Sequence, residues 1–198
     1  MGFPSFEPLY KKKTHLHLYG DKINNALWKN HLKIFMGKPF WPIGLGEAPA
    51  NATLQDLPSD KGEMDIFGIH LTWINVPHPQ RCLSYRIDTP DFSVVIATDT
   101  EYESADEISD EFSSICKKTD YLLFDAQFLP SEYQSHKGWG HSSWVTAANI
   151  AKKCKVKNLI LIHHAPDRTD SELQKIQPEV QKIFPSATVG IETMSWES

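Results

Sequence analysis

Polar and apolar residues follow two different periods along the chain, and together they predict a succession of strands and helices. The segment THLHLYG (14–20) alternates polar and apolar positions, which is typical of a half-buried strand. Apolar residues at helical spacing instead predict a helix over 23–37, with Gly37 as its stop. The following residues, 38–62, are rich in proline and glycine and predict mostly loop.

The rest of the chain shows the same alternation in shorter steps. Apolar runs predict strands at 66–76, 82–88, 92–99, 121–126, 158–164 and 188–196. Helical spacing predicts helices at 105–118, at 142–154 with Ser142 or Ser143 as the cap, and at 171–184 with an interruption at Pro178. Strands alternating with helices indicate one α/β domain over residues 1–198.

Composition narrows the class of protein further. The net charge of −5 and the pI near 6.0 argue against a surface that binds nucleic acid as a whole. No run of 18 apolar residues is present, so no membrane span is expected. The cysteines Cys82, Cys116 and Cys154 are odd in number and lack C-x-x-C spacing, which favours free thiols in a reducing compartment. Without a signal-like N-terminus, we expect a cytoplasmic protein.

Candidate chemistry gathers where the predicted strands end. The side chains concerned are His78 in VPHP, Asp99 in ATDTE, Asp125 in FDAQF, His163 and His164 in LIHHAP, and His141 in GWGHSS just before a helix. Each alone has an ordinary explanation as a turn cap or a loop histidine. Because buried strands with polar ends place those ends on one rim of a sheet, their recurrence predicts one functional site.

These motifs, in this order, resemble the C-terminal two-thirds of a metallo-β-lactamase-fold hydrolase. The similarity covers about residues 66–172, and the opening GFPSF also fits. It is greatest to the branch that holds ribonuclease Z and the cyclic-phosphate phosphodiesterases. The resemblance implies an αβ/βα sandwich and two divalent metal ions at one edge of its sheets, zinc first, with manganese or iron as alternatives.

The resemblance also implies a role for each candidate. His78 corresponds to a ligand of the first metal, Asp99 to the carboxylate that bridges both metals, and His163 to a ligand of the second. His141 corresponds to the histidine that faces the scissile phosphate, and Asp125 to an acidic residue that supports the site. His164 has no counterpart among the ligands, so a supporting position is expected for it.

One motif of the family is not found in this sequence. The family's H-x-H-x-D-H supplies ligands to both metals, but in THLHLYGD the aspartate Asp21 lies four residues after His17 and no histidine follows it. We therefore expect His15 and His17 to be ordinary strand residues. The resemblance begins just downstream of that motif, so we expect an N-terminally truncated form of the fold with incomplete metal sites.

Two functions stay open on this evidence. The first is a metal-dependent hydrolase that attacks a phosphodiester or another small-molecule substrate with metal-activated water. The second is a catalytically silent fragment with a binding or structural role. Processing of transfer RNA precursors is disfavoured, because the family's tRNA-binding arm lies between the residues that correspond to His78 and Asp99, only 21 positions apart here. The oligomeric state is left open, a homo-oligomer included.

Overall fold

The computed structural model describes residues 3–23, 26–58, 60–192 and 194–195, and for 22–23 and 26–27 the backbone only. The chain divides into two compact units, Met1–Asp60 and Lys61–Ser198, and each is described by itself. A single domain over 1–198 stays a prediction. None of the helices in the described ranges combines the length and the apolar run that a bilayer crossing needs.

The first unit is built around a two-stranded parallel sheet of β1 (His15–Gly20) and β4 (Asn51–Asp56). The predicted strand at 14–20 is confirmed. The predicted loop at 38–62 was wrong over β4, because strand pairing with β1 overrides the local turn signals. The helix expected over 23–37 is shorter: the structure has the short strands β2 (Lys22–Ile23) and β3 (Ala26–Leu27) and then α1 (Trp28–Phe35), while residues 24–25 lie outside the described ranges.

The second unit is a seven-stranded mixed sheet with helices. Its strands are β5 (Lys61–Ile66), β6 (Ile69–Val76), β7 (Cys82–Asp88), β8 (Ser93–Ala97), β9 (Tyr121–Asp125), β10 (Asn158–Ile162) and β11 (Ala187–Val189). Its α-helices are α2 (Asp110–Cys116), α3 (Pro130–Tyr133), α4 (Trp144–Cys154) and α5 (Asp170–Ile183). The predicted α/β class is confirmed.

Several predicted boundaries differ from the structure for local reasons. The strand expected at 66–76 is the second arm of a hairpin, since Phe67 and Gly68 take positive φ and form a turn after β5. Helix α5 passes through Pro178 without a break, and its buried face of Leu173, Ile176 and Val180 offsets the lost backbone hydrogen bond. The 105–118 helix divides into a 3₁₀ turn at Ala105–Glu107 and α2.

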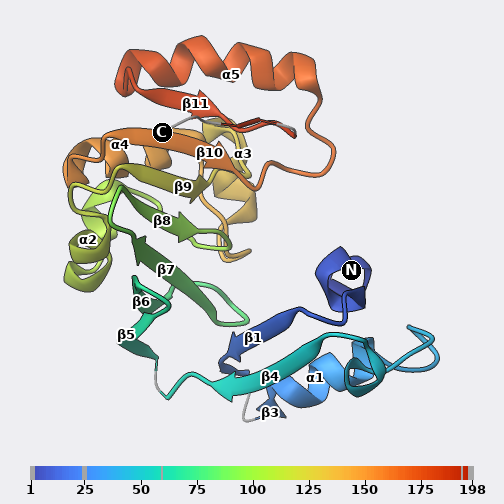
Figure 1. Ribbon diagram of the computed structural model, residues 1–198. Coiled ribbons are helices and arrows are strands. Elements are labelled where there is room, and N and C mark those ends of the chain that lie inside the picture. Colours follow the sequence, from blue (N-terminus) through green and yellow to red (C-terminus); the bar gives the residue numbers. More distant parts are fainter. Residues whose placement is uncertain (1–2, 24–25, 59, 193, 196–198) are drawn as a thin grey trace. The chain divides into compact units, whose positions relative to one another are not determined.

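The order of the strands brings the strand ends together. The sheet runs β11-β10-β9-β8-β7-β6-β5, as Figure 1 shows, and β8 to β11 are mutually parallel. Strand β7 is antiparallel to both β6 and β8, so β6 runs in the same direction as β8. The carboxyl ends of β6, β8, β9 and β10 therefore lie on one edge of the sheet.

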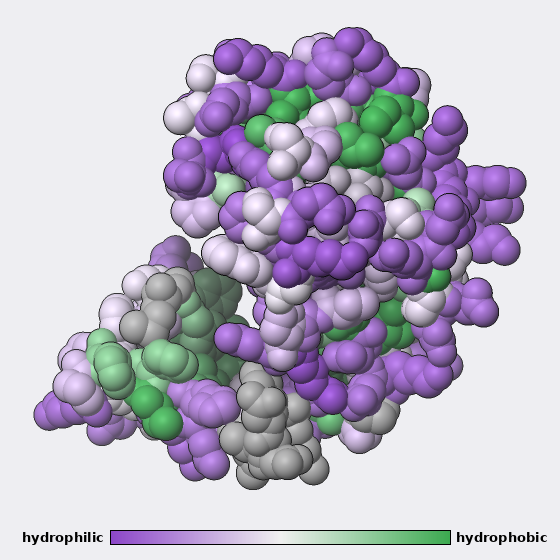
Figure 2. Space-filling view, turned by 180° about the vertical axis from the view of Figure 1, so that it is seen from behind, coloured by the Kyte–Doolittle hydropathy of each residue, from purple (hydrophilic) through white to green (hydrophobic). Residues whose placement is uncertain are grey.

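One face of this sheet carries the core of the second unit. Side chains of α2, α4 and α5 pack on strand residues such as Val95, Leu122, Phe124 and Leu161, which are fully buried. In Figure 1, α4 and α2 lie beside the central strands and α5 lies along β11. Hydrophilic residues cover most of the side of this unit that faces the viewer in Figure 2, with hydrophobic residues showing between them. The packed core thus supports the sheet edge where the strands end.

Asp120 ties the start of β9 to β8, and its removal gives a prediction for stability. Its carboxylate accepts hydrogen bonds from Ser93 N (2.7 Å) and Ser93 Oγ (2.8 Å) and pairs with Lys157. The ion pair with Lys157 and the Ser93 hydrogen bonds lower the pKa of Asp120 to about 2. We expect Asp120→Asn to lower the free energy of unfolding at pH 7 by about 1–2 kcal/mol.

The pH dependence of this loss follows from the sign of the shift. A carboxylate whose pKa is lower in the folded state stabilises the fold above its unfolded pKa of about 3.9, and this contribution is lost as the pH falls toward 2. Urea unfolding at pH 7 and pH 3 should therefore show a smaller difference between parent and variant at pH 3. Asp106→Asn is the matched control, because that side chain is 97% exposed and its ion pair with Lys153 (3.4 Å) lies at the surface. A loss of equal size at both pH values would contradict the assignment.

Candidate metal centre

The predicted site residues all lie at the edge where the strands end. His78 follows β6, Asp99 follows β8, Asp125 is the last residue of β9, and His163 comes directly after β10. His141 precedes α4, whose N-cap is Ser143; the Ser143 side chain accepts a hydrogen bond from Thr146 N. These residues meet because the carboxyl ends of β6, β8, β9 and β10 share one edge of the sheet.

Asp99 lies between two imidazole rings at this edge. Its Oδ1 is 3.9 Å from Nε2 of His78 and 3.6 Å from Nε2 of His163. These separations are longer than a hydrogen bond and close to the ~3.3 Å between two ligand atoms on one tetrahedral zinc ion with bonds of about 2.0–2.1 Å. The arrangement therefore suits a shared cation better than direct hydrogen bonding.

Asp125 is the buried anchor of the site. Its carboxylate is fully buried, and its Oδ2 lies 2.8 Å from Nδ1 of His141 and 3.2 Å from Nδ1 of His163. The same carboxylate accepts three backbone hydrogen bonds, from Asp99 N (3.0 Å), Gln127 N (3.2 Å) and Ser142 N (3.1 Å). One carboxylate thus fixes the rings of two histidines and the backbone on which Asp99 stands.

The pKa shifts of Asp125 and His163 follow from those contacts. Burial disfavours the charged carboxylate, but hydrogen bonds from His141 and His163 outweigh it, and the pKa of Asp125 is lowered. The hydrogen bond with Asp125 raises the pKa of His163 against the opposing effect of burial. With its Nδ1–H on Asp125, neutral His163 presents the lone pair of Nε2 toward Asp99, which is the carboxylate–histidine arrangement common at metal sites.

The backbone is strained at two of these positions. Asp99 has φ of 50° and His163 has φ of 60°, in the left-handed region that residues with a Cβ rarely adopt. Such strain costs on the order of 1 kcal/mol or more per residue and is concentrated at functional sites. The turns after β8 and β10 therefore orient Asp99 and His163 at a cost in stability.

Two residues that the sequence did not single out shape the site. A Cβ on Gly140 would lie 2.1 Å from Cδ2 of His78, so only glycine lets the loop before His141 pass over the His78 ring. Glu101 accepts hydrogen bonds from Gly138 N and Gly140 N, both at 2.7 Å, and holds this loop in place. Glu101 stands two residues after Asp99, but no local spacing indicates a partner almost 40 residues away.

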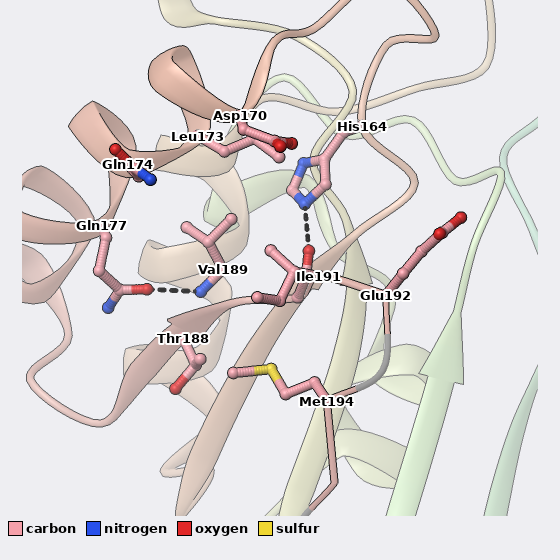
Figure 3. Close-up of a pocket in the computed structure, with 11 residues that line it drawn as sticks. His164, Asp170, Leu173, Gln174, Gln177, Thr188, Val189, Ile191, Glu192 and Met194 are labelled. Atoms are coloured by element: carbon pink, nitrogen blue, oxygen red, sulfur yellow. Dashed lines mark hydrogen bonds between the residues drawn. The ribbon is translucent and has the colours of Figure 1, made fainter.

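His164 occupies a different environment from His163. Its Nε2 is 3.2 Å from the carbonyl oxygen of Gly190, and burial lowers its pKa. Figure 3 shows its ring directed toward the chain beyond β11, at the wall of a cavity of about 670 Å³ that α5 also lines. This cavity is larger than the one of about 490 Å³ that His78 lines, but it holds no comparable set of ligand atoms among the described residues. We therefore place the chemistry at the groups around Asp99 and Asp125.

His15 and His17 are exposed residues of β1, and the alternation predicted for this strand is confirmed. Nδ1 of His17 lies 3.0 Å from Thr53 Oγ1, and Nδ1 of His15 lies 3.5 Å from Asn51 Nδ2, both across the pairing with β4. Neither belongs to a potential metal-binding group among the residues that the structure describes.

The donor set fits a divalent cation. Two overlapping groups each bring three ligand atoms within 4.8 Å of one another: His78, Asp99 and His141, and Asp125, His141 and His163. Imidazole nitrogen with carboxylate oxygen is a donor set that zinc, manganese and iron accept. His78 fits least well. Its Nδ1 accepts a hydrogen bond from Gln80 N (3.2 Å) and is therefore without a proton. A neutral imidazole that binds a cation through Nε2 carries its proton on Nδ1, so this hydrogen bond would be lost.

Comparison with known proteins gives the family. Residues 48–164 match the family described as the beta-lactamase superfamily domain, which is more than half of the chain. The chain belongs to this superfamily, and its fold is the metallo-β-lactamase fold. The matching sequences include ribonuclease Z of Enterococcus faecalis, 32% identical over 76 residues, and ribonuclease Z of Prochlorococcus marinus, 36% identical over 101 residues. These matches cover 38% and 49% of this chain but only 24% and 30% of the relatives' own lengths.

Solved structures agree on the fold. The metallo-beta-lactamase fold protein YhfI from Bacillus subtilis aligns over 95% of this chain and 65% of its own, with a TM-score of 0.67 and 20% identity. A diphosphatase of the PhnP family aligns over 100% and 66%, with a TM-score of 0.67 and 17% identity. The short form of human tRNase Z aligns over 98% and 72%, with a TM-score of 0.60 and 15% identity. At such identities the likeness concerns the fold, and the predicted fold class is confirmed.

Proposed function

We propose that this protein is a metal-dependent hydrolase whose substrate is a phosphodiester. The observation that carries the proposal is the pair of overlapping histidine–aspartate groups, which share His141 and lie at one edge of the sheet. Ribonuclease Z and a PhnP-family diphosphatase among the similar proteins support phosphate ester chemistry. Zinc is the first candidate, with manganese and iron as alternatives.

The proposed division of labour follows the geometry. His78, Asp99 and His163 would hold the metal ions, with Asp99 between the two imidazoles. Bound divalent metal supplies a water of lowered pKa and a positive charge for a phosphoryl oxygen. Asp125 keeps the rings of His141 and His163 oriented through their Nδ1 atoms.

His141 is proposed as the acid–base residue. Its Nδ1 is engaged by Asp125, so Nε2 is the atom that can hold a proton and transfer it to the leaving oxygen. The aromatic neighbours Phe128 and His78, with ring centroids 6.1 Å and 5.7 Å away, restrict the rotation of the ring. A fixed imidazole at the metal edge suits general acid catalysis better than a mobile one.

His141→Ala tests this role. We expect the turnover number for bis-p-nitrophenyl phosphate to fall by about 10²-fold or more, the usual scale of one acid–base group. Metal content after dialysis, measured by elemental analysis, should stay at the parent level, because His141 is proposed to act on the substrate. His70→Ala removes a histidine bonded to Asp65 on the β5–β6 hairpin and should leave both quantities unchanged. Loss of metal in His141→Ala would show instead that His141 is a ligand.

The second candidate is a binding protein without catalysis. It is favoured by one observation, that the family's H-x-H-x-D-H motif is not found in these 198 residues. On this alternative the chain binds metal or a phosphate ester but releases no p-nitrophenol above the rate of the His141→Ala variant. The same assay therefore decides between the two functions.

A further inference from the structure

Trp139 is a large apolar side chain that the proposed mechanism does not use. It lies two residues before His141, and 61% of it is exposed. Gly138 and Gly140 flank it with φ of 91° and 96°, so the backbone turns sharply on both sides. An indole exposed next to a candidate active site offers an apolar π-face that a ligand can contact.

The indole is held in a fixed position despite its exposure. Gly138 N and Gly140 N donate to the two carboxylate oxygens of Glu101, and Trp139 N donates to the carbonyl of His136 at 3.0 Å. The ring of His136 meets the indole edge-on, with 4.7 Å between centroids. The ring of Phe128 in turn stacks on the ring of His136, with 4.6 Å between centroids. A row of ring contacts, from Trp139 through His136 and Phe128, thus connects the indole with His141.

The surroundings favour a small aromatic ligand over a protein or a long nucleic acid. Phe67 and Phe92, two other exposed aromatics of this unit, precede β6 and β8 and therefore lie at the opposite edge of the sheet, so they do not extend an apolar surface around Trp139. Lys137, the basic residue next to this loop, is paired with Glu103. Glu101, Glu103 and Glu107 line the surface beside Gly138, and such an acidic neighbourhood does not attract a polyanionic backbone.

From this geometry we infer that Trp139 is a stacking platform for an aromatic group, such as a nucleobase, on a phosphodiester whose phosphate lies at the histidine–aspartate groups. The inference rests on the proposed function and names the substrate class for it. Every base has a π-face, so stacking on tryptophan selects for an aromatic group without selecting one base. His136 and Phe128 act as positioning residues for the platform.

Binding of two phosphates that differ in the base alone tests the inference. Adenosine 5′-monophosphate and ribose 5-phosphate are titrated by calorimetry, with zinc present, into the parent chain and into the variants Trp139→Ala, Trp139→Phe and Phe67→Ala. We expect the parent to bind the nucleotide more tightly than the sugar phosphate. Trp139→Ala should weaken nucleotide binding by about 10-fold or more and leave the sugar phosphate unchanged. Trp139→Phe should retain most of the nucleotide affinity, and Phe67→Ala all of it.

Several outcomes would overturn the platform. The first two are equal affinity of the parent for both phosphates and no binding of either. The third is equal weakening of both in Trp139→Ala. The fourth is a change in the oligomeric mass of Trp139→Ala in solution with nucleotide binding intact, which would show that Trp139 makes a contact between chains. Circular dichroism of each variant excludes misfolding, and Trp139→Phe keeps the test valid where the alanine variant fails to fold. Base-dependent binding without any hydrolysis would reject the proposed catalysis and retain the platform.

Discussion

His163→Ala is expected to abolish binding of the metal ion that Asp99 and His163 are proposed to hold, and to lower phosphodiester hydrolysis by more than ~100-fold. Nε2 of His163 lies 3.6 Å from Asp99 Oδ1, and the proposed cation would bind between these two atoms. Removing even a residue that only supports a metal ligand lowers metal affinity or activity about 10–100-fold, so loss of a ligand should cost more. Elemental analysis after dialysis measures the metal, and release of p-nitrophenol from bis-p-nitrophenyl phosphate measures the hydrolysis.

The neighbouring histidine provides the matched control. His164→Ala removes an imidazole at the next position, but that ring is bonded to the Gly190 carbonyl at the wall of the α5 cavity (Figure 3). We expect its metal content to equal that of the parent. If His164→Ala lost metal and His163→Ala kept it, the assignment of the site to the group around Asp99 and Asp125 would be wrong.

The second large effect concerns stability. Asp125→Asn replaces one buried carboxylate oxygen by an amide N–H₂ that must face hydrogen-bond donors, since both oxygens accept from backbone or histidine N–H groups. Leaving such groups unsatisfied costs about 3 kcal/mol, or roughly 6–12 °C in the midpoint of thermal unfolding for a chain of this size. Circular dichroism in the presence of a chelator measures the folded chain without any contribution from metal.

Asp106→Asn again serves as the control, because its side chain is almost fully exposed (97%). Its midpoint should stay within about 2 °C of the parent. A small shift for Asp125→Asn as well would mean that Asp125 is not an anchor of the site. The proposed orientation of His141 and His163 would then lose its basis.

Much of the second unit was determined by the sequence itself. Continuous apolar runs such as 121–126 and 158–164 are typical of strands buried within a parallel sheet, and the structure has β9 and β10 there. The sequence also showed that Asp99, Asp125 and His163 stand where apolar runs end. Because parallel strands expose their carboxyl ends on one edge, these residues had to meet once the sheet formed.

Local patterns were weaker where pairing with distant strands decided the structure. Strand β4 lies in a stretch whose prolines and glycines predicted loop, and it forms only because β1, more than 30 residues earlier, offers a parallel partner. Pro178 was expected to interrupt a helix, but burial of Leu173, Ile176 and Val180 keeps α5 continuous. Propensity is a preference of a few tenths of a kcal/mol to ~3 kcal/mol per residue, and tertiary packing can exceed it.

The sequence by itself determined which residue types carry the chemistry and which edge of the sheet they reach. Only the tertiary structure decided how they are held: the Asp125 carboxylate shared by His141 and His163, the loop over His78 that Gly140 permits, and the clamp of Glu101 beneath Trp139. Each of these contacts joins residues 16 to 62 positions apart, and hydrogen bonds over such separations leave no periodic signal in the chain. They exist because folding the sheet brings its strand ends within hydrogen-bonding distance.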